Sequence, residues 1–247
     1  APGTLVALSV LIAALIAFAV RFRVVAAPGF SFEPIRGPLI RALLLGVAVV
    51  SLVGAVTYVI VALEYMYDMS PLSAAVAVIP AQIGAILGAK VIAGAAMNRL
   101  GVRTAGRHLM LVLAVAQLPL VGMQADSPAW YLVVCATLFL TAAFAAITVL
   151  NTDVMSYAPP GRTGPVSAIR GAASAIGAGL GVVVLGTSVI TAVNIRGGET
   201  HVGAEQIRQL ALGLRLDGII GSAVVLIAWF ALTIVERTSP PPLPAEP

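Results

Sequence analysis

The sequence predicts an all-α, polytopic membrane protein, a helical bundle of about seven transmembrane helices. Of its 247 residues, 60% are hydrophobic and only 10% are charged, and its mean hydropathy is +1.06. A soluble globular domain carries about 25% charged residues, so water is not the main solvent of this chain. The charges also gather between long apolar runs rather than within them.

Seven apolar runs are long enough to cross a hydrocarbon core about 30 Å thick, which takes about 20 helical residues. They are apolar on every face, whereas a helix of a soluble protein keeps a polar stripe. None alternates between two faces as a barrel strand does. The runs cover 4–20, 39–63, 72–97, 106–124, 130–151, 164–193 and 211–235.

The arginines predict the orientation of these runs, because cytoplasmic loops carry an excess of Lys and Arg. Alternate connections are basic, and those between them are mainly acidic. The basic connections contain Arg21, Arg23, Arg36, Arg41, Arg99, Arg103, Arg107, Arg162 and Arg237. We therefore expect a multi-pass protein of the prokaryotic plasma membrane with a cytoplasmic C-terminus. The same arginines explain the pI near 9.7, so no nucleic-acid partner is expected.

The chain divides into four parts. We expect a linker transmembrane helix at 1–20, a cytoplasmic linker at 21–38 that prolines and glycines interrupt, and a six-helix bundle at 39–238. The tail at 239–247 is rich in proline. We favour a disordered tail over a polyproline II segment that a partner domain would bind.

The connection after the third run resembles a loop of the major facilitator superfamily. The segment from Gly94 to Arg103 is similar to a cytoplasmic loop between two spans of that family, with Asn98 in place of the acidic residue of the stronger form. In this resemblance Gly94 allows close helix approach and Gly101 forms the turn. Arg99 and Arg103 then hold the hairpin in the cytoplasm.

Two further segments, 65–72 and 152–187, resemble the 14-span drug and proton antiporters of that superfamily. The resemblance implies the C-terminal half of a transporter that exports small amphiphilic molecules or drugs in exchange for protons. The implied partners are the lipid bilayer, the missing N-terminal half, a small-molecule substrate and protons. Because alternating access needs two halves around one site, further spans are expected before Ala1. The alternative is a non-transporting helical scaffold or assembly subunit.

We single out three charged residues as lying within the membrane: Lys90, Asp153 and Arg170. Charge within hydrocarbon costs at least about 2.5–3.5 kcal/mol and marks a pathway or a pair. We expect Lys90 and Gln82 to line a substrate cavity, and Arg170 and Ser174 to line it from the sixth run. The alternative for the long basic side chains is that they reach the interface. Asp153 and Arg170 are also candidates for a gate or coupling pair, joined by an ion pair between consecutive runs.

The charges also predict a substrate class. Quaternary-ammonium exporters of the family that the chain resembles carry acids in the third and sixth of these spans, and this chain has none there. We find no carboxylate in the middle of a run. A buried cation stabilises an anion and repels a cation, so neutral or weakly acidic amphiphiles are the expected substrates.

Small residues and prolines predict how the helices pack. Two motifs of the small-xxx-small type let membrane helices approach closely. They pair Gly84 with Gly88 and Gly177 with Gly181. Pro80 and Pro119 are expected to kink their spans.

Enzyme chemistry finds no support in the sequence. His108 and His201 are isolated, and neither a Cys/His cluster nor a nucleophile with a base is visible. Cys135 lies in an apolar run, where a small buried residue is expected. We therefore expect no enzymatic activity, no cofactor and no metal.

Overall fold

The structure, a computed structural model, describes residues 36–156, 158, 163–184 and 203–238, and every regular element in these ranges is a helix. The expected linker helix at 1–20, most of the linker at 21–38 and the tail at 239–247 lie outside the described residues. Residues from Arg36 onward form one unit of the chain.

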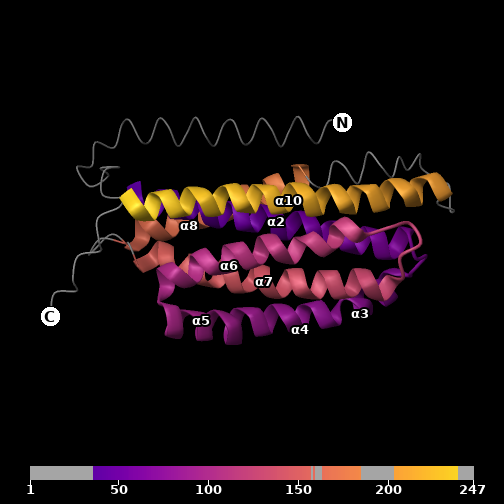
Figure 1. Ribbon diagram of the computed structural model, residues 1–247, viewed down its shortest axis with the longest axis horizontal. Helices are drawn as coiled ribbons and strands as arrows, with labels where there is room; N and C mark the ends of the chain where they lie inside the picture. The colour runs from indigo at the N-terminus through magenta and orange to yellow at the C-terminus, as the bar shows by residue number, and fades with distance from the viewer. Residues whose placement is uncertain (1–35, 157, 159–162, 185–202, 239–247) are drawn as a thin grey trace. The chain divides into compact units, whose positions relative to one another are not determined.

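The elements follow one another back and forth along a common direction (Figure 1). In order they are α2 (Arg36–Tyr65), α3 (Pro71–Ala77), α4 (Ile79–Leu87), the π-helical η2 (Gly88–Ile92), α5 (Ala93–Leu100), α6 (Val102–Gln117), the 3₁₀-helical η3 (Leu118–Gly122), α7 (Ala129–Ser156), α8 (Thr163–Val184) and α10 (Ala204–Thr238).

Four helical segments are long and apolar enough to cross a membrane: Pro71–Leu100, Val102–Gly122, Ala129–Ser156 and Ala204–Phe230. Each overlaps one of the expected runs. Helices α2 and α8 cover two more of those runs, and the run at 4–20 lies outside the described residues. The described part of the chain is thus a helical membrane bundle with four candidate spans, not the seven of the prediction.

Polar and proline residues set the helix boundaries. Before α3, Ser70 is the N-cap, and its Oγ accepts a hydrogen bond of 3.2 Å from the Ser73 N–H. The break between α3 and α4 falls at Val78, just before Pro80, and Pro119 lies at the start of η3. Proline lacks the N–H that an α-helix needs, so both prolines interrupt their spans as expected.

Helix α7 is the centre of the bundle. It packs mainly against α2, α4 and α6, and it also touches η2, α5 and α8. Helix α10 lies against α6, η3 and α2, and α8 packs chiefly on α2. Many buried positions of α7 are alanines, which let neighbouring backbones approach closely. They are Ala136, Ala142, Ala143, Ala145 and Ala146.

Glycines make the closest helix contacts. The four expected packing glycines are all buried, namely Gly84, Gly88, Gly177 and Gly181. A Cβ at Gly84 or at Gly88 would collide with Thr141 of α7, and one at Gly177 would collide with the Gly46 carbonyl of α2. Any larger residue at these three positions would force the helices apart.

The tight turn between α5 and α6 requires glycine. Gly101 has φ 76° and ψ 157°, a region that is essentially confined to glycine. Gly94 behaves differently from the expectation, since no described atom lies within 4 Å of the place where its Cβ would be. Close helix approach is therefore not the role of Gly94 within the described part of the chain. Asn98 and Arg99 are exposed, and Arg103 is half-buried.

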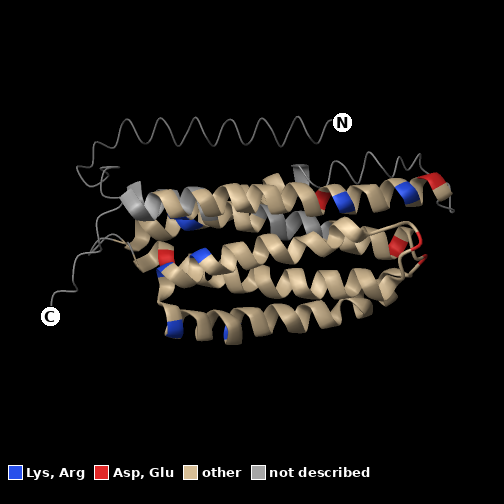
Figure 2. Cartoon of the chain, viewed as in Figure 1, with Lys and Arg blue, Asp and Glu red and all other residues tan. Residues whose placement is uncertain are grey.

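Charges separate along the bundle. Figure 2 shows most basic residues at or near the end where α5 meets α6, with an acidic residue among them, and other acidic residues at the opposite end, where the first part of α10 carries both signs of charge. This matches the alternation of basic and acidic connections along the sequence. The two ends therefore differ in charge, as the ends of a bundle with a fixed orientation in a membrane do.

At the acidic end, Tyr67 joins two connections. Its hydroxyl donates a hydrogen bond of 2.7 Å to the Ser127 carbonyl oxygen, which ties the connection after α2 to the one before α7. Burial raises the pKa of Tyr67 to about 12. The neutral phenol is thus favoured in the folded state, a contribution that is complete below about pH 10 and is lost as the pH rises through about 12.

Tyr67→Phe should lower the free energy of unfolding by about 0.5–1.5 kcal/mol at neutral pH, because it removes this hydrogen bond. The difference from wild type should narrow between pH 10 and 12, where the wild-type hydroxyl ionises. Thermal unfolding of the detergent-solubilised protein measures both effects, with Tyr65→Phe at the end of α2 as control. A difference that does not change with pH would contradict this role of the hydroxyl.

Candidate functional site

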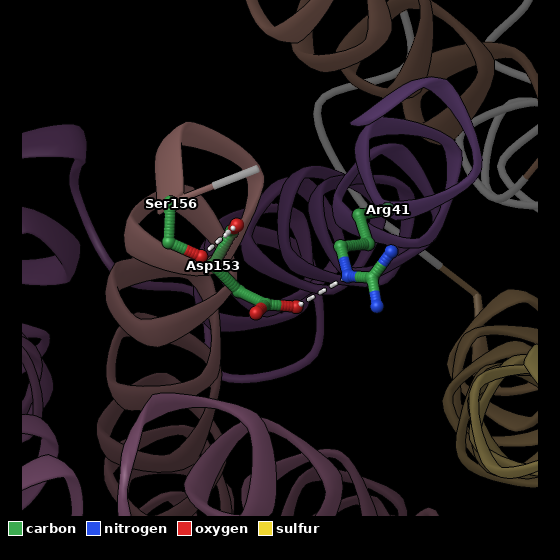
Figure 3. Close-up of polar contacts among 3 residues, drawn as sticks. All are labelled: Arg41, Asp153 and Ser156. Carbon is green, nitrogen blue, oxygen red and sulfur yellow. Dashed lines mark hydrogen bonds and ion pairs between the residues drawn. The ribbon is translucent and has the colours of Figure 1, made fainter. Parts of the chain in front are cut away.

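A buried ion pair joins α2 to α7. The Nε of Arg41 donates to Oδ2 of Asp153 at 3.1 Å, and the two side chains are only 1% and 4% exposed. Arg41 lies about 7.5 Å from the start of α2, and Asp153 about 4.5 Å from the end of α7, so the pair is near one end of the bundle. Figure 3 shows the guanidinium of α2 reaching across to the carboxylate.

The surroundings of Asp153 reinforce this contact. The Ser156 hydroxyl donates to the backbone carbonyl of Asp153 at 2.8 Å, which helps to close the last turn of α7. Arg103 of α6 is near enough for its charge to act on the Asp153 carboxylate. The carboxylate thus joins α2 to α7 at their basic end, and α6 brings a further positive charge toward it.

Sequence reasoning assigned the wrong partner to Asp153. Arg170 lies half-exposed on α8, and the ion pair that the described residues form uses Arg41 instead. Arg41 was grouped with the charges of a loop, yet it is buried within α2. Both partners belong to the same bundle, so the pair fastens α2 to α7. A gate between this bundle and a second one would need a contact that crosses from one to the other.

The expected cavity residues do not come together. Gln82 and Lys90 are both exposed and lie eight residues apart on one span, about 12 Å along the helix. Arg170 and Ser174 are on α8, which packs on α2 and α7 rather than on that span. Gln82 lines a small cleft of about 20 Å³ with apolar residues of α2, α4 and α7, including Val59. That cleft has room for about one water molecule, not for a substrate.

Lys90 has a distinctive backbone. It is the middle residue of η2, the π-helical turn Gly88–Ile92. Such turns are rare and are often found at functional sites. The turn begins at Gly88, which is in tight contact with Thr141, and the Lys90 side chain is exposed.

A second buried carboxylate, Asp217, lies inside α10. It is 2% exposed, and neither carboxyl oxygen has a hydrogen-bond partner among the described residues. Asp217 is the central residue of the 27-residue candidate span Ala204–Phe230. An acid in this position is costly and marks a functional site by default.

Glycines on α10 let the neighbouring elements approach closely in the helical turns before and after Asp217. A Cβ at Gly213 would lie 3.1 Å from the Tyr58 ring of α2, and one at Gly218 would lie 3.0 Å from the Gln117 carbonyl oxygen. A Cβ at Gly221 would collide with the Gln117 side chain. Asp217 is therefore enclosed by α2, α6 and η3, at the level of the 3₁₀ turn.

Two further hydrogen bonds hold α10 in this place. Arg215 Nε donates to the Val121 carbonyl oxygen at 3.1 Å, and the Ser222 hydroxyl donates to the Ala114 carbonyl oxygen at 2.8 Å. They lie on either side of Asp217 along α10. Side chains of α10 thus donate hydrogen bonds to backbone carbonyls of α6 and η3, whereas the Asp217 carboxylate takes part in no hydrogen bond among the described residues.

Asp217 corrects the sequence prediction that no run carries a carboxylate in its middle. It lies within the run at 211–235 and is the central residue of the candidate span Ala204–Phe230. The signal is nevertheless present in the sequence, since Asp217 and the nearby Arg215 are charged residues within this run. The inference of a preference for neutral or weakly acidic substrates therefore loses its basis.

Metal and thiol chemistry gain no candidate in this bundle. The described residues contain no group of three or more His, Cys, Asp or Glu side chains that could hold a metal ion. Cys135 is a free, buried cysteine in α7.

The chain matches no protein-family model, and no curated protein matches it.

Asp153→Asn should lower the free energy of unfolding by about 3–5 kcal/mol, because it leaves the buried Arg41 without its counter-ion. Replacing both partners by apolar residues, Arg41→Met with Asp153→Leu, should recover much of this loss. The control is Glu205→Gln, since Glu205 pairs with Arg208 at 3.7 Å with both side chains largely exposed. That change should cost no more than about 1 kcal/mol. Thermal unfolding in detergent gives the comparison, and equal shifts for Asp153→Asn and Glu205→Gln would contradict the importance of the buried pair.

Proposed function

We propose that this chain is the C-terminal half of a secondary transporter of the major facilitator type, which exports small amphiphilic molecules in exchange for protons. The observation that carries the proposal is Asp217, a buried carboxylate without a partner among the described residues, inside a bundle of apolar helices. Ionisable groups in such positions belong to ion or proton pathways far more often than to static packing.

The packing supports the same function. Secondary transporters move by rocking rigid bundles of helices, which requires bundles that hold together as units. Glycine contacts between α4 and α7 and between α2 and α8, together with the Arg41–Asp153 pair, give this bundle that cohesion. The resemblance of 94–103 to a major facilitator loop, and of 65–72 and 152–187 to drug and proton antiporters, points the same way. Residues 39–238 would then form the six-helix half.

In the proposed orientation, the basic end of the bundle faces the cytoplasm of a prokaryotic cell and the acidic end faces outward. The connection around Asn98 would be inside, and the connection around Asp126 outside. Both residues are exposed, so both positions suit chemical labelling.

Cysteine labelling tests this orientation. In a Cys135→Ala background, an impermeant maleimide added to intact cells should label Asp126→Cys and not Asn98→Cys. Opening the cells should make both positions reactive. Labelling of Asn98→Cys in sealed cells would reverse the proposed orientation, and labelling of both in sealed cells would exclude a single topology.

An assembly subunit is the second candidate function, and one observation favours it. Helix α8 has an open face of small residues, since no described atom lies within 4 Å of a Cβ placed at Gly164, Gly171 or Gly179. Such a face suits close packing against another helix. In the transporter that helix would belong to the missing half, whereas in a scaffold it would belong to a different protein.

Transport by the complete gene product distinguishes the two functions. Proteoliposomes that contain it should move a fluorescent amphiphile when a pH gradient is imposed, at least about tenfold faster than protein-free liposomes. Collapse of the gradient with an ionophore should abolish the movement. If the gradient drives no movement of neutral, anionic or cationic probes, the transporter proposal is wrong and the scaffold remains.

A further inference from the structure

Asp217 is enclosed by elements that supply it with no positive charge. Its neighbours are α2, α6 and η3, and none of the charged groups of the described residues is close enough to act on it. Arg215, two residues earlier, donates to the Val121 carbonyl instead. The titratable side chains described on α2, α6 and α10 are Arg41, Tyr58, Glu64, Tyr65, Arg103, Arg107, His108, Glu205, Arg208, Arg215 and Asp217 itself, and η3 has none.

Of these groups, Tyr58 lies at the same interface. It is fully buried on α2, and its ring and hydroxyl lie 3.1 and 3.2 Å from the Cβ position of Gly213, one helical turn before Asp217. One turn after Asp217, Gly221 meets the amide side chain of Gln117. The side chains that α10 meets one turn before and one turn after Asp217 are thus a phenol and an amide, neither of which brings a positive charge.

The helix contacts on either side of Asp217 are close. A Cβ at Gly218 would lie 3.0 Å from both the Gln117 carbonyl oxygen and Leu120 Cβ, and one at Gly221 would collide with Gln117. A proton binds to one carboxylate oxygen, whereas a hard metal cation needs a shell of six or more oxygen ligands.

Building on the proposed transport function, we propose that Asp217 is a proton-binding site, occupied while α10 packs against α6 and η3 and emptied when that contact opens. The chemistry is a simple protonation. One carboxylate oxygen takes a proton from a hydronium ion, whose O–H bond breaks to leave water, and forms an O–H bond of its own. When the proton leaves, that bond breaks and the proton returns to a water molecule as hydronium, so no oxidant or co-reactant is needed.

The link between protonation and packing follows from solvation. A neutral carboxylic acid is tolerated in an apolar interior, whereas an ionised carboxylate without hydrogen bonds is strongly disfavoured there. Loss of the proton must therefore bring water to Asp217, and in this proposal water enters where α10 parts from η3. Gly218 and Gly221 make close contacts here, and the hydrogen bonds of the Arg215 and Ser222 side chains to Val121 and Ala114 would have to break when α10 parts from η3 and α6.

Infrared spectroscopy of the complete protein in lipid nanodiscs tests the site directly. The wild type should show a C=O band of a protonated carboxyl that disappears as the pH is raised, and Asp217→Asn should lack this band at every pH. Asp126→Asn, which changes an exposed acid, should keep it. A band that persists in Asp217→Asn would overturn the assignment, as would loss of the wild-type band on addition of NaCl at constant pH, which would indicate a cation site.

Hydrogen exchange tests the coupling to packing. Amides of residues 204–222 should lose protection by at least about tenfold in the wild type over the pH range in which the band disappears. Asp217→Asn is a neutral isostere of the protonated acid, so it should fold and stay protected over that whole range. Equal loss of protection in both proteins would overturn the coupling.

The two proposals fail in different ways. If the band titrates as expected but a pH gradient drives no transport, the proton site stands and the transporter proposal fails. If the gradient drives transport equally well in wild type and in Asp217→Asn, the transporter proposal stands and Asp217 is not its proton site.

Discussion

The buried ion pair between Arg41 and Asp153 is the contact on which the basic end of the bundle depends. Hydrocarbon solvates neither group, so each can be buried only with the other, and the pair fixes how α2 meets α7. Helix α7 in turn contacts α4, α6 and α8. The relative placement of the helices at the basic end thus depends on one carboxylate, which Arg103 approaches from a third helix.

Away from that pair, close packing rather than charge holds the helices together, since lipid tails are as apolar as the side chains that they would replace. Gly84 and Gly88 meet α7 at Thr141, whose hydroxyl is already satisfied by the Thr137 carbonyl of its own helix at 2.7 Å. The threonine therefore presents no unpaired polar group at the contact. Large apolar residues such as Ile83 and Ile86 lie exposed on the same span, where lipid or a further helix would cover them.

Local features were predictable from sequence, and tertiary partners were not. The breaks at Pro80 and Pro119 and the positive φ of Gly101 follow from the chemistry of single residues. The partner of Asp153 depends on how helices far apart in the chain meet, which no local pattern encodes, so proximity in sequence wrongly favoured Arg170. Lys90 illustrates the same limit, because its depth along the span was predictable but the face on which it lies was not. Asp217 was missed for a simpler reason, since one acid hardly lowers the hydropathy of a long run.

The two buried acids, Asp153 and Asp217, have opposite environments, and this difference indicates a structural role for Asp153 and a different role for Asp217. Asp153 has a guanidinium at 3.1 Å, and its burial is explained by the helices that it joins. Asp217 has no hydrogen bond within the described chain and joins nothing, while Arg215 and Ser222 on the same helix make the contacts to η3 and α6. An apolar side chain of similar size would pack there without the penalty of burying an unpaired polar group. Packing therefore gives no reason for an acid at this position. Binding and release of a proton inside the bundle require an ionisable side chain, and the carboxyl group of Asp217 is one.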